Sequence, residues 1–155
     1  AQAVRTLNCP VIANGNVVNS QTGLSYLKST GAAGLMIGRG AIRNPWIFEQ
    51  IRCATSKQKI PQVTGRMILE YIAKLYDETA HEISEFIEDR HVQKMKKYLV
   101  YITQGHHADF EHQIRRVKNK TEFFDTCIRF LDHEDDAPDL PSENSRLFCG
   151  FSQFL

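Results

Sequence analysis

The sequence predicts an α/β segment followed by an all-α bundle, with helix predominating overall. Two observations carry this prediction. Six of the nine glycines fall in the first 52 residues, and three of them lie in the turns that close two short apolar runs. Beyond residue 60 the glycines thin out and apolar residues recur at helical spacing. We therefore expect a first domain at residues 1–60, a helical bundle at 61–131 and an acidic tail at 132–155.

The two apolar runs, residues 10–13 and 34–37, each end in a glycine-rich turn. Short, continuously apolar runs closed by glycine are typical of buried parallel strands. Between them, residues 20–30 place apolar side chains at helical spacing and stop before Gly31, a residue type that favours a helix C-terminus. This order predicts a βαβ unit. Asn44-Pro45-Trp46 then favours a further helix, with Asn44 as its cap and proline in its first turn.

Four amphipathic segments follow in the second half of the chain. They span residues 64–88, 91–103, 108–117 and 121–131. Asn119, with Glu122 three residues later, resembles a capping box at the start of the last segment. Helices joined by short turns favour a small antiparallel bundle. The tail from residue 132 to 143 holds six acids and no base, which predicts a solvated, extended segment.

Composition and charge exclude several classes of protein. The chain has 155 residues, of which 42% are apolar, and 19 basic residues nearly balance 18 acidic ones, as in ordinary globular proteins. It has neither a long apolar run nor a basic-then-apolar leader, so we expect no membrane span, no secretory signal and a cytoplasmic location. Because it starts with Ala1 rather than Met, we expect a fragment.

The cysteines and histidines give little support for metal or redox chemistry. The four cysteines are scattered without a CxxC pair, which fits reduced thiols. Cys9 and Cys127 are best explained as small apolar core residues. His106, His107 and His112 lie close in sequence, but no second group of ligands completes a zinc site. We predict no metal centre and assign no catalytic residue.

The two glycine-rich turns are candidates for an anion site. Turns after neighbouring parallel strands bring backbone N–H groups to one edge of a sheet, where a phosphate can bind. Gly15, Gly38 and Gly40 let the backbone approach closely, Arg39 adds charge and Asn14 adds an amide. Ordinary βα turns without a ligand use the same residue types, so turn chemistry alone leaves both interpretations open.

Residues 10–16 and 30–48 carry a more specific resemblance. Their sequences, PVIANGN and TGAAGLMIGRGAIRNPWIF, resemble the flavin-phosphate region of the tRNA-dihydrouridine synthases. The resemblance extends over residues 2–131, since Met95-Lys-Lys-Tyr98 and the later Gly105 are similar to a basic, aromatic stretch of that family. It implies the C-terminal fragment of a (β/α)8 TIM barrel followed by a helical tRNA-binding domain.

The same resemblance implies a cofactor and a reaction. FMN, with NADPH as reductant, would reduce uridine in tRNA to 5,6-dihydrouridine. The flavin phosphate would be held by Asn14, Gly15, Asn16, Gly38 and Arg39. Asn16 departs from the family pattern, which has aspartate there, so that contact loses its charge. The family's catalytic cysteine and first six strands would precede Ala1, so we expect the chain alone to be inactive and the full-length protein to be a monomer.

The near-neutral total conceals separated charges. Residues 77–89 hold six acids and no Lys or Arg, whereas residues 90–120 hold eight bases against two acids, a net charge of +6. A basic segment of this kind contacts nucleic-acid phosphates without reading their sequence. The alternative is a set of solvated helix faces paired with the acidic segment. With the resemblance, we expect tRNA contacts from Lys94, Lys96, Lys97, Arg115, Arg116 and Lys118.

Two other functions stay open at this point. One is another FMN or phosphate-binding TIM-barrel oxidoreductase, although residues 44–48 and the appended helices argue against it. The other is a non-catalytic RNA-binding module, which would apply if the chain acts at this length. Six strand–helix units upstream of Ala1, with a cysteine in a glycine-flanked loop, would favour the synthase.

Overall fold

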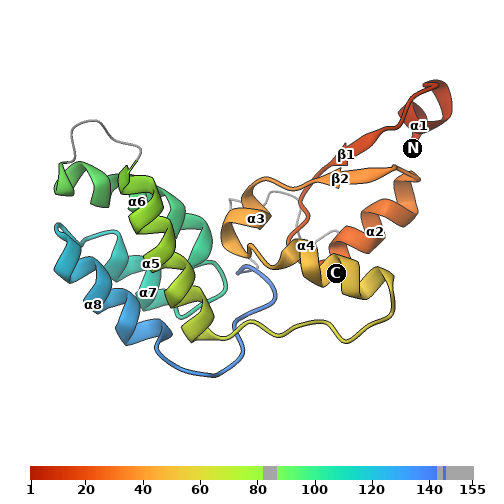
Figure 1. The fold of residues 1–155 in the computed structure, drawn as a ribbon. Helices are drawn as coiled ribbons and strands as arrows, with labels where there is room; N and C mark the ends of the chain where they lie inside the picture. The colour runs from red at the N-terminus through yellow and green to blue at the C-terminus, as the bar shows by residue number, and fades with distance from the viewer. Residues whose placement is uncertain (82–86, 143–144, 146–155) are drawn as a thin grey trace. The chain divides into compact units, whose positions relative to one another are not determined.

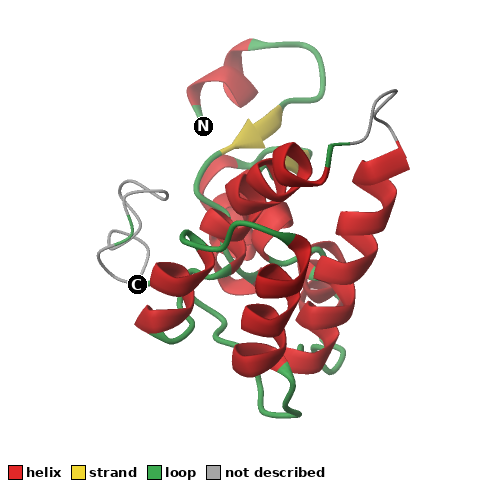
Figure 2. Cartoon of the chain, turned by 90° about the vertical axis from the view of Figure 1, so that its left-hand side faces the viewer, coloured by secondary structure: helices red, strands yellow, loops and turns green. Residues whose placement is uncertain are grey.

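The chain divides into two compact units. A computed structural model describes residues 1–81, 87–142 and 145. Among the described residues, 1–61 and those from Asp139 onward make unit 1, and those from 62 to 138 make unit 2. Figure 1 labels the elements of each unit, and Figure 2 shows that helices predominate among them. The prediction of a mostly helical chain with a small parallel sheet is confirmed.

Unit 1 contains the predicted βαβ arrangement. Its parallel strands, β1 (Ile12–Asn14) and β2 (Gly34–Met36), pair with Ile12 opposite Gly34. Helix α2 (Ser20–Thr30) joins them and contacts both (Figure 1). The helix begins at a capping box between Asn19 and Thr22 and ends at Gly31, whose φ of 68° lies in the left-handed region that favours glycine.

The strands are less buried than their apolar composition predicts. Ile12 is 57% exposed and Met36 is 50% exposed. Cys9, which the sequence places in the core, is exposed as well. The predictions of buried strands and of a buried Cys9 are therefore wrong for this chain. The physical reason is that two strands leave their edges open and cannot enclose the side chains between them.

The core of unit 1 lies where α2 packs on α4 (Ile47–Thr55). Val17, Val18 and Ile47 are almost completely buried there. Two short helices, α1 (Gln2–Thr6) and α3 (Arg39–Arg43), complete the unit. The sequence pattern predicts neither the five-residue α3 nor its position directly after β2, because so short a helix shows no periodicity.

The start of α4 differs from the prediction. Asn44 does not cap a helix that begins at Pro45; instead its Oδ1 accepts from the Trp46 backbone N–H at 3.2 Å, and its carbonyl accepts from the Ile47 N–H at 3.1 Å. These bonds close a turn over Pro45 and Trp46. The helix therefore begins two residues later than expected.

Unit 2 consists of four helices in the described residues. They are α5 (Gly65–His81), α6 (Glu88–Ile102), α7 (Ala108–Ile114) and α8 (Lys120–Leu131). The prediction of one helix over 64–88 is wrong in part, because Ile87 is extended and a new helix begins at Glu88. The stretch 82–86 of that prediction lies outside the described residues. The other three ranges agree with the prediction to within three residues at each end.

The apolar stripes of these helices meet in one core. Val92, Met95, Leu99 and Ile102 of α6 are completely buried, as the spacing predicts. Cys127 of α8 is completely buried too, and burial raises the pKa of its thiol to about 12, so its interpretation as a core residue is confirmed. Asn119 caps α8, since its side chain accepts from the Glu122 N–H at 2.9 Å, as predicted. The Glu122 carboxylate accepts from the Lys118 N–H at 2.8 Å rather than from the Asn119 N–H, so one half of the predicted capping box is present.

The acidic segment after α8 forms no helix in its described residues, and its backbone is not simply solvated. The N–H groups of Gly65 and Arg66 donate to the carbonyls of Asp135 and His133, at 3.2 and 2.9 Å. The Ala137 N–H donates to the Val63 carbonyl at 2.7 Å. The segment therefore accepts hydrogen bonds from the first turn of α5, which a pattern of acidic residues does not predict.

Candidate functional site

The turns after β1 and β2 line one small cavity in unit 1. Because the strands are parallel and in register, both turns leave the sheet at the same end. The cavity measures about 200 Å³. It is lined by Asn14, Gly15, Asn16, Val17, Met36, Gly38, Arg39 and Gly40. All five residues predicted to hold a phosphate therefore border the same space.

Two side chains join the turns. The Arg39 guanidinium donates to the Asn16 Oδ1 at 3.3 Å, so the second turn is bonded to the first. The Asn16 N–H donates to the Tyr26 hydroxyl at 3.3 Å, which ties the first turn to α2. A neutral amide at position 16 orients Arg39 without cancelling its charge, as an aspartate in this place would. Arg39 is the one charged residue among those that line the cavity.

The glycines of the two turns play different parts. A Cβ on Gly38 would have nothing within 4 Å, so this residue leaves open space at the cavity. A Cβ on Gly40 would lie 2.1 Å from the Val17 carbonyl oxygen, so glycine is required there for the two turns to approach. A Cβ on Gly15 would lie 2.6 Å from the Tyr26 ring. Gly38 shapes the space, whereas Gly15 and Gly40 allow the packing around it.

The basic residues of unit 2 that are predicted to contact RNA differ in solvent exposure. Lys97, Arg115, Arg116 and Lys118 are exposed. Lys94 and Lys96 are half-buried. The Lys96 ammonium donates to the Val117 carbonyl at 3.0 Å and so ties α6 to the connection between α7 and α8. Lys96 therefore has a structural contact that the sequence does not indicate.

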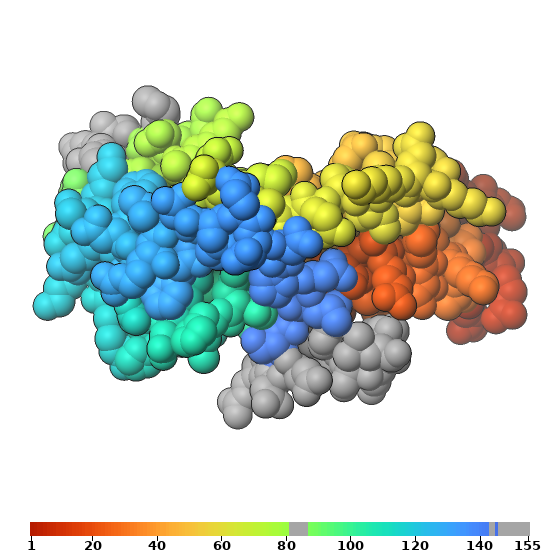
Figure 3. All heavy atoms as spheres, turned by 90° about the horizontal axis from the view of Figure 1, so that it is seen from below, coloured from red at the N-terminus to blue at the C-terminus, as the bar shows by residue number. Residues whose placement is uncertain are grey.

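A groove between α7 and α8 lies beside Arg116. It measures about 370 Å³, and Figure 3 shows the two helices, in turquoise and blue, adjoining on one face of unit 2. His112, Gln113, Arg116 and Val117 line one side, and Glu122, Asp125, Thr126 and Arg129 line the other. This surface mixes both signs of charge, so it is less uniformly basic than the sequence segment predicts.

Neither a metal centre nor a membrane span is found in the described part of the chain. No three His, Cys, Asp or Glu residues within it converge as metal ligands would, and His106, His107 and His112 are no exception. None of its helices combines the length and the apolar character needed to cross a bilayer.

The sequence that forms these turns and helices matches a known family. A family model described as dihydrouridine synthase (Dus) matches residues 1–135 of the chain. The chain belongs to the dihydrouridine synthase family. The resemblance seen in the glycine-rich turns is thereby confirmed, and the match extends through all four helices of unit 2.

Individual relatives of this chain agree with the family match. A probable tRNA-dihydrouridine synthase of Helicobacter pylori strain J99 is 37% identical over 102 residues, which are 65% of this chain and 28% of the relative. One of Mycobacterium tuberculosis strain H37Rv is 26% identical over 140 residues, 90% of this chain and 34% of the relative. The tRNA-dihydrouridine synthase B of Shewanella oneidensis is 36% identical over 78 residues, 47% of this chain and 24% of the relative. The matched part is thus about a quarter to a third of each relative's length.

Several residues that build these surfaces escape sequence analysis. Tyr26 has the spacing of an ordinary apolar helix residue, yet its hydroxyl holds the first turn. Asp139 lies in the acidic tail, yet its carboxylate accepts from the Asn19 side chain at 2.6 Å. The only available signal for Tyr26 is its hydroxyl in an otherwise apolar stripe, and no local signal marks Asp139, because its partners are more than ninety positions away.

Proposed function

We propose that this chain is the C-terminal portion of a flavin-dependent tRNA-dihydrouridine synthase. Unit 1 supplies part of the flavin-phosphate site and unit 2 contacts tRNA. The observation that carries the proposal is the convergence of both glycine-rich turns on one cavity beside Arg39. The family membership and the names of the relatives support the same activity.

The residues at the cavity fit a phosphate. Open space at Gly38 admits a group against the backbone, and Arg39 offers a guanidinium whose orientation Asn16 fixes. The carboxylates that would repel a phosphate are absent among the residues that line the cavity. Asn14, Gly15, Asn16, Gly38 and Arg39 would hold the phosphate of FMN. When bound, FMN would pass a hydride from NADPH to the uracil ring.

The exposed strands support the barrel part of the proposal. Ile12 and Met36 are apolar yet half exposed, which is costly on a two-stranded sheet in water. In a (β/α)8 barrel, neighbouring strands cover such side chains. We infer that β1 and β2 are the last two strands of a TIM barrel whose other strands, with the catalytic residues, lie outside this chain.

Gly38→Val tests the flavin-phosphate site. The new side chain would occupy part of a cavity of about 200 Å³ without meeting another atom within 4 Å at its Cβ. In the complete enzyme we expect FMN affinity to fall by tenfold or more, about 1.4 kcal/mol, while thermal stability changes little. Flavin absorbance of the purified protein and FMN titration of the apoprotein measure the effect. Ala33→Val, an exposed change outside the cavity, should retain flavin; equal retention by Gly38→Val would rule the site out.

Lys97→Ala combined with Lys118→Ala tests the tRNA surface. Both side chains are exposed, so their loss removes charge without removing packing. We expect weaker tRNA binding, with the slope of log affinity against log salt reduced by about two. Electrophoretic mobility shifts across a salt series measure both quantities on the 155-residue chain.

Two controls sharpen this experiment. Lys28→Ala with Lys59→Ala removes the same charge from unit 1 and should leave the salt slope nearly unchanged. Lys96→Ala should lower the free energy of unfolding by about 1 kcal/mol, because the Val117 carbonyl loses its donor. If both double variants reduce binding equally, net charge alone explains the binding, and the assignment of tRNA contact to unit 2 fails.

A further inference from the structure

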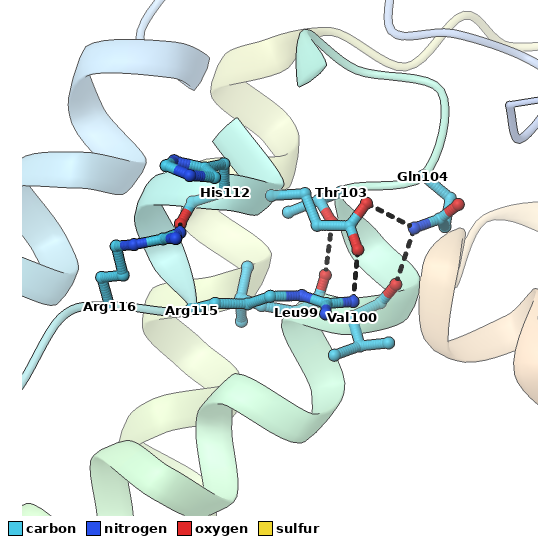
Figure 4. Close-up of polar contacts among 8 residues, drawn as sticks. Leu99, Val100, Thr103, Gln104, His112, Arg115 and Arg116 are labelled. Atoms are coloured by element: carbon cyan, nitrogen blue, oxygen red, sulfur yellow. Dashed lines mark hydrogen bonds and ion pairs between the residues drawn. The ribbon is translucent and has the colours of Figure 1, made fainter. Parts of the chain in front are cut away.

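Helix α7 carries a series of polar contacts that ends at an exposed arginine (Figure 4). Gln104 is 5% exposed, and its side-chain nitrogen donates to the Val100 carbonyl and to one carboxylate oxygen of Glu111, each at 3.1 Å. The other carboxylate oxygen of Glu111 accepts from the Arg115 guanidinium. A buried amide thus holds a carboxylate that in turn holds an exposed cation.

The turn between α6 and α7 fixes the position of Gln104. The Thr103 hydroxyl donates to the Leu99 carbonyl at 2.8 Å, and Gly105 then reverses the chain with a φ of 91°, a value that favours glycine. The Val100 carbonyl and the Glu111 carboxylate are both acceptors, so the NH2 group of Gln104, rather than its oxygen, must face them. Since α6 and the turn constrain it from both sides, Gln104 is a rigid support for Glu111.

Arg115 and its neighbours form one surface on α7. Ala108, Glu111, His112, Arg115 and Arg116 line the same hollow. The Arg115 side chain remains 55% exposed although Glu111 binds it, and the Arg116 guanidinium donates to the His112 carbonyl at 2.8 Å. A guanidinium has five N–H donors in a planar fork, so an arginine held in this way still has donors for a phosphate oxygen.

We propose that Glu111 and Gln104 are positioning residues that hold Arg115 for contact with a phosphate of the tRNA backbone. The inference rests on the proposed function and deepens it. It distinguishes a basic side chain that the protein holds in a fixed orientation from one that contributes its charge alone. Glu111 is one of two acids among residues 90–120, and it reduces the positive charge of that segment. An acid in this place strengthens phosphate binding only if the orientation it gives Arg115 outweighs the charge it cancels.

Glu111→Gln provides the decisive test, because the two explanations predict opposite signs. The substitution adds one positive charge, so a surface that binds by charge alone should bind tRNA more tightly. A positioned Arg115 should bind about three- to tenfold less tightly, because the guanidinium must then be ordered on binding. Asp125→Asn is the matched control: it adds the same charge on the neighbouring helix α8, where Asp125 is exposed in the groove, and it should tighten binding.

A double-mutant cycle links the effect to Arg115. In an Arg115→Ala background, Glu111→Gln should no longer weaken binding, whereas additive effects would show that Glu111 acts elsewhere. Arg115→Lys keeps the charge but loses the fork, and it should bind as weakly as Glu111→Gln. This variant leaves Glu111 and Gln104 in place, so it tests the inference even if Glu111→Gln fails to fold.

The outcomes separate the inference from the proposed function. Salt-dependent tRNA binding by the unmodified 155-residue chain, with tighter binding by both Glu111→Gln and Asp125→Asn, overturns positioning and leaves the tRNA surface standing. Weaker binding by Glu111→Gln beside tighter binding by Asp125→Asn supports positioning. Absence of salt-dependent binding by the unmodified chain overturns both.

Discussion

Replacing Gly40 with alanine is expected to unfold much of unit 1. A Cβ at this position would lie 2.1 Å from the carbonyl oxygen of Val17 and 3.3 Å from the Ile37 side chain. The nearest atom belongs to the backbone, so no rotation of a flexible side chain relieves the contact. Overpacking of this kind costs about 3 kcal/mol, and the turns after β1 and β2 must separate. Hydrogen exchange of the α2 and α4 amides should accelerate, while α6 and α8 of unit 2 keep their protection.

Gly38→Ala is the matched control for this prediction. It places the same methyl group two residues earlier, where nothing lies within 4 Å. The free energy of opening that hydrogen exchange reports for the α2 and α4 amides should change by less than about 1 kcal/mol. If Gly40→Ala proves as harmless as Gly38→Ala, the two turns are not held at the close approach that the cavity requires.

The glycines of the two turns also show how much of the site the sequence predicts. The glycine-rich turns and their parallel strands predict that Gly15, Gly38 and Gly40 lie at one site, and the structure brings them together. The pattern cannot assign separate tasks to them, because the atoms they approach come from distant positions. Gly40 meets Val17, and Gly15 meets Tyr26. Which glycine leaves space and which permits packing depends on tertiary contacts.

In unit 2, too, the sequence predicts local features but not the contacts between distant residues. Amphipathic spacing is a local property, so it predicts α6, α7 and α8 closely and identifies buried residues such as Met95 and Leu99. The roles of surface bases depend on neighbours from other helices. Lys96 reaches the Val117 carbonyl across 21 positions, and a basic pattern treats it no differently from exposed Lys97. The sequence therefore predicts a basic surface, but it does not show which of the basic side chains form hydrogen bonds inside the protein.

Asp139 lies beside the buried cation of unit 1. Arg43 is only 4% exposed; burial lowers the pKa of its guanidinium to about 10, and the nearby Asp139 carboxylate opposes this shift. Arg43 also donates to the Asp139 backbone carbonyl at 3.1 Å. Since the folded state lowers this pKa, burying the charged guanidinium costs stability at neutral pH, and the cost diminishes as the pH rises through about 10. Asp139 offsets part of that cost.

Asp139→Ala is therefore expected to destabilise unit 1 by about 1 to 2 kcal/mol at neutral pH, mainly through the lost hydrogen bond to Asn19, because Asp139 is itself exposed and solvent screens its attraction to Arg43. It removes the carboxylate near Arg43 and the acceptor of the Asn19 side chain, which is 2% exposed and caps α2. Thermal denaturation should shift down by about 5 to 10 °C. Asp135→Ala, which removes a 93% exposed acid of the same segment, should cost less than about 0.5 kcal/mol.

Arg43→Met separates the two contributions of Asp139. In the Asp139→Ala background it removes the buried guanidinium together with its desolvation cost, so it should restore part of the lost stability, because a buried apolar side chain of similar length carries no such cost. The loss that remains reports the hydrogen bond to Asn19, about 1 kcal/mol, and should appear as faster amide exchange in the first turn of α2. If Arg43→Met fails to restore stability, Asp139 acts through Asn19 alone and the electrostatic account of this contact is wrong.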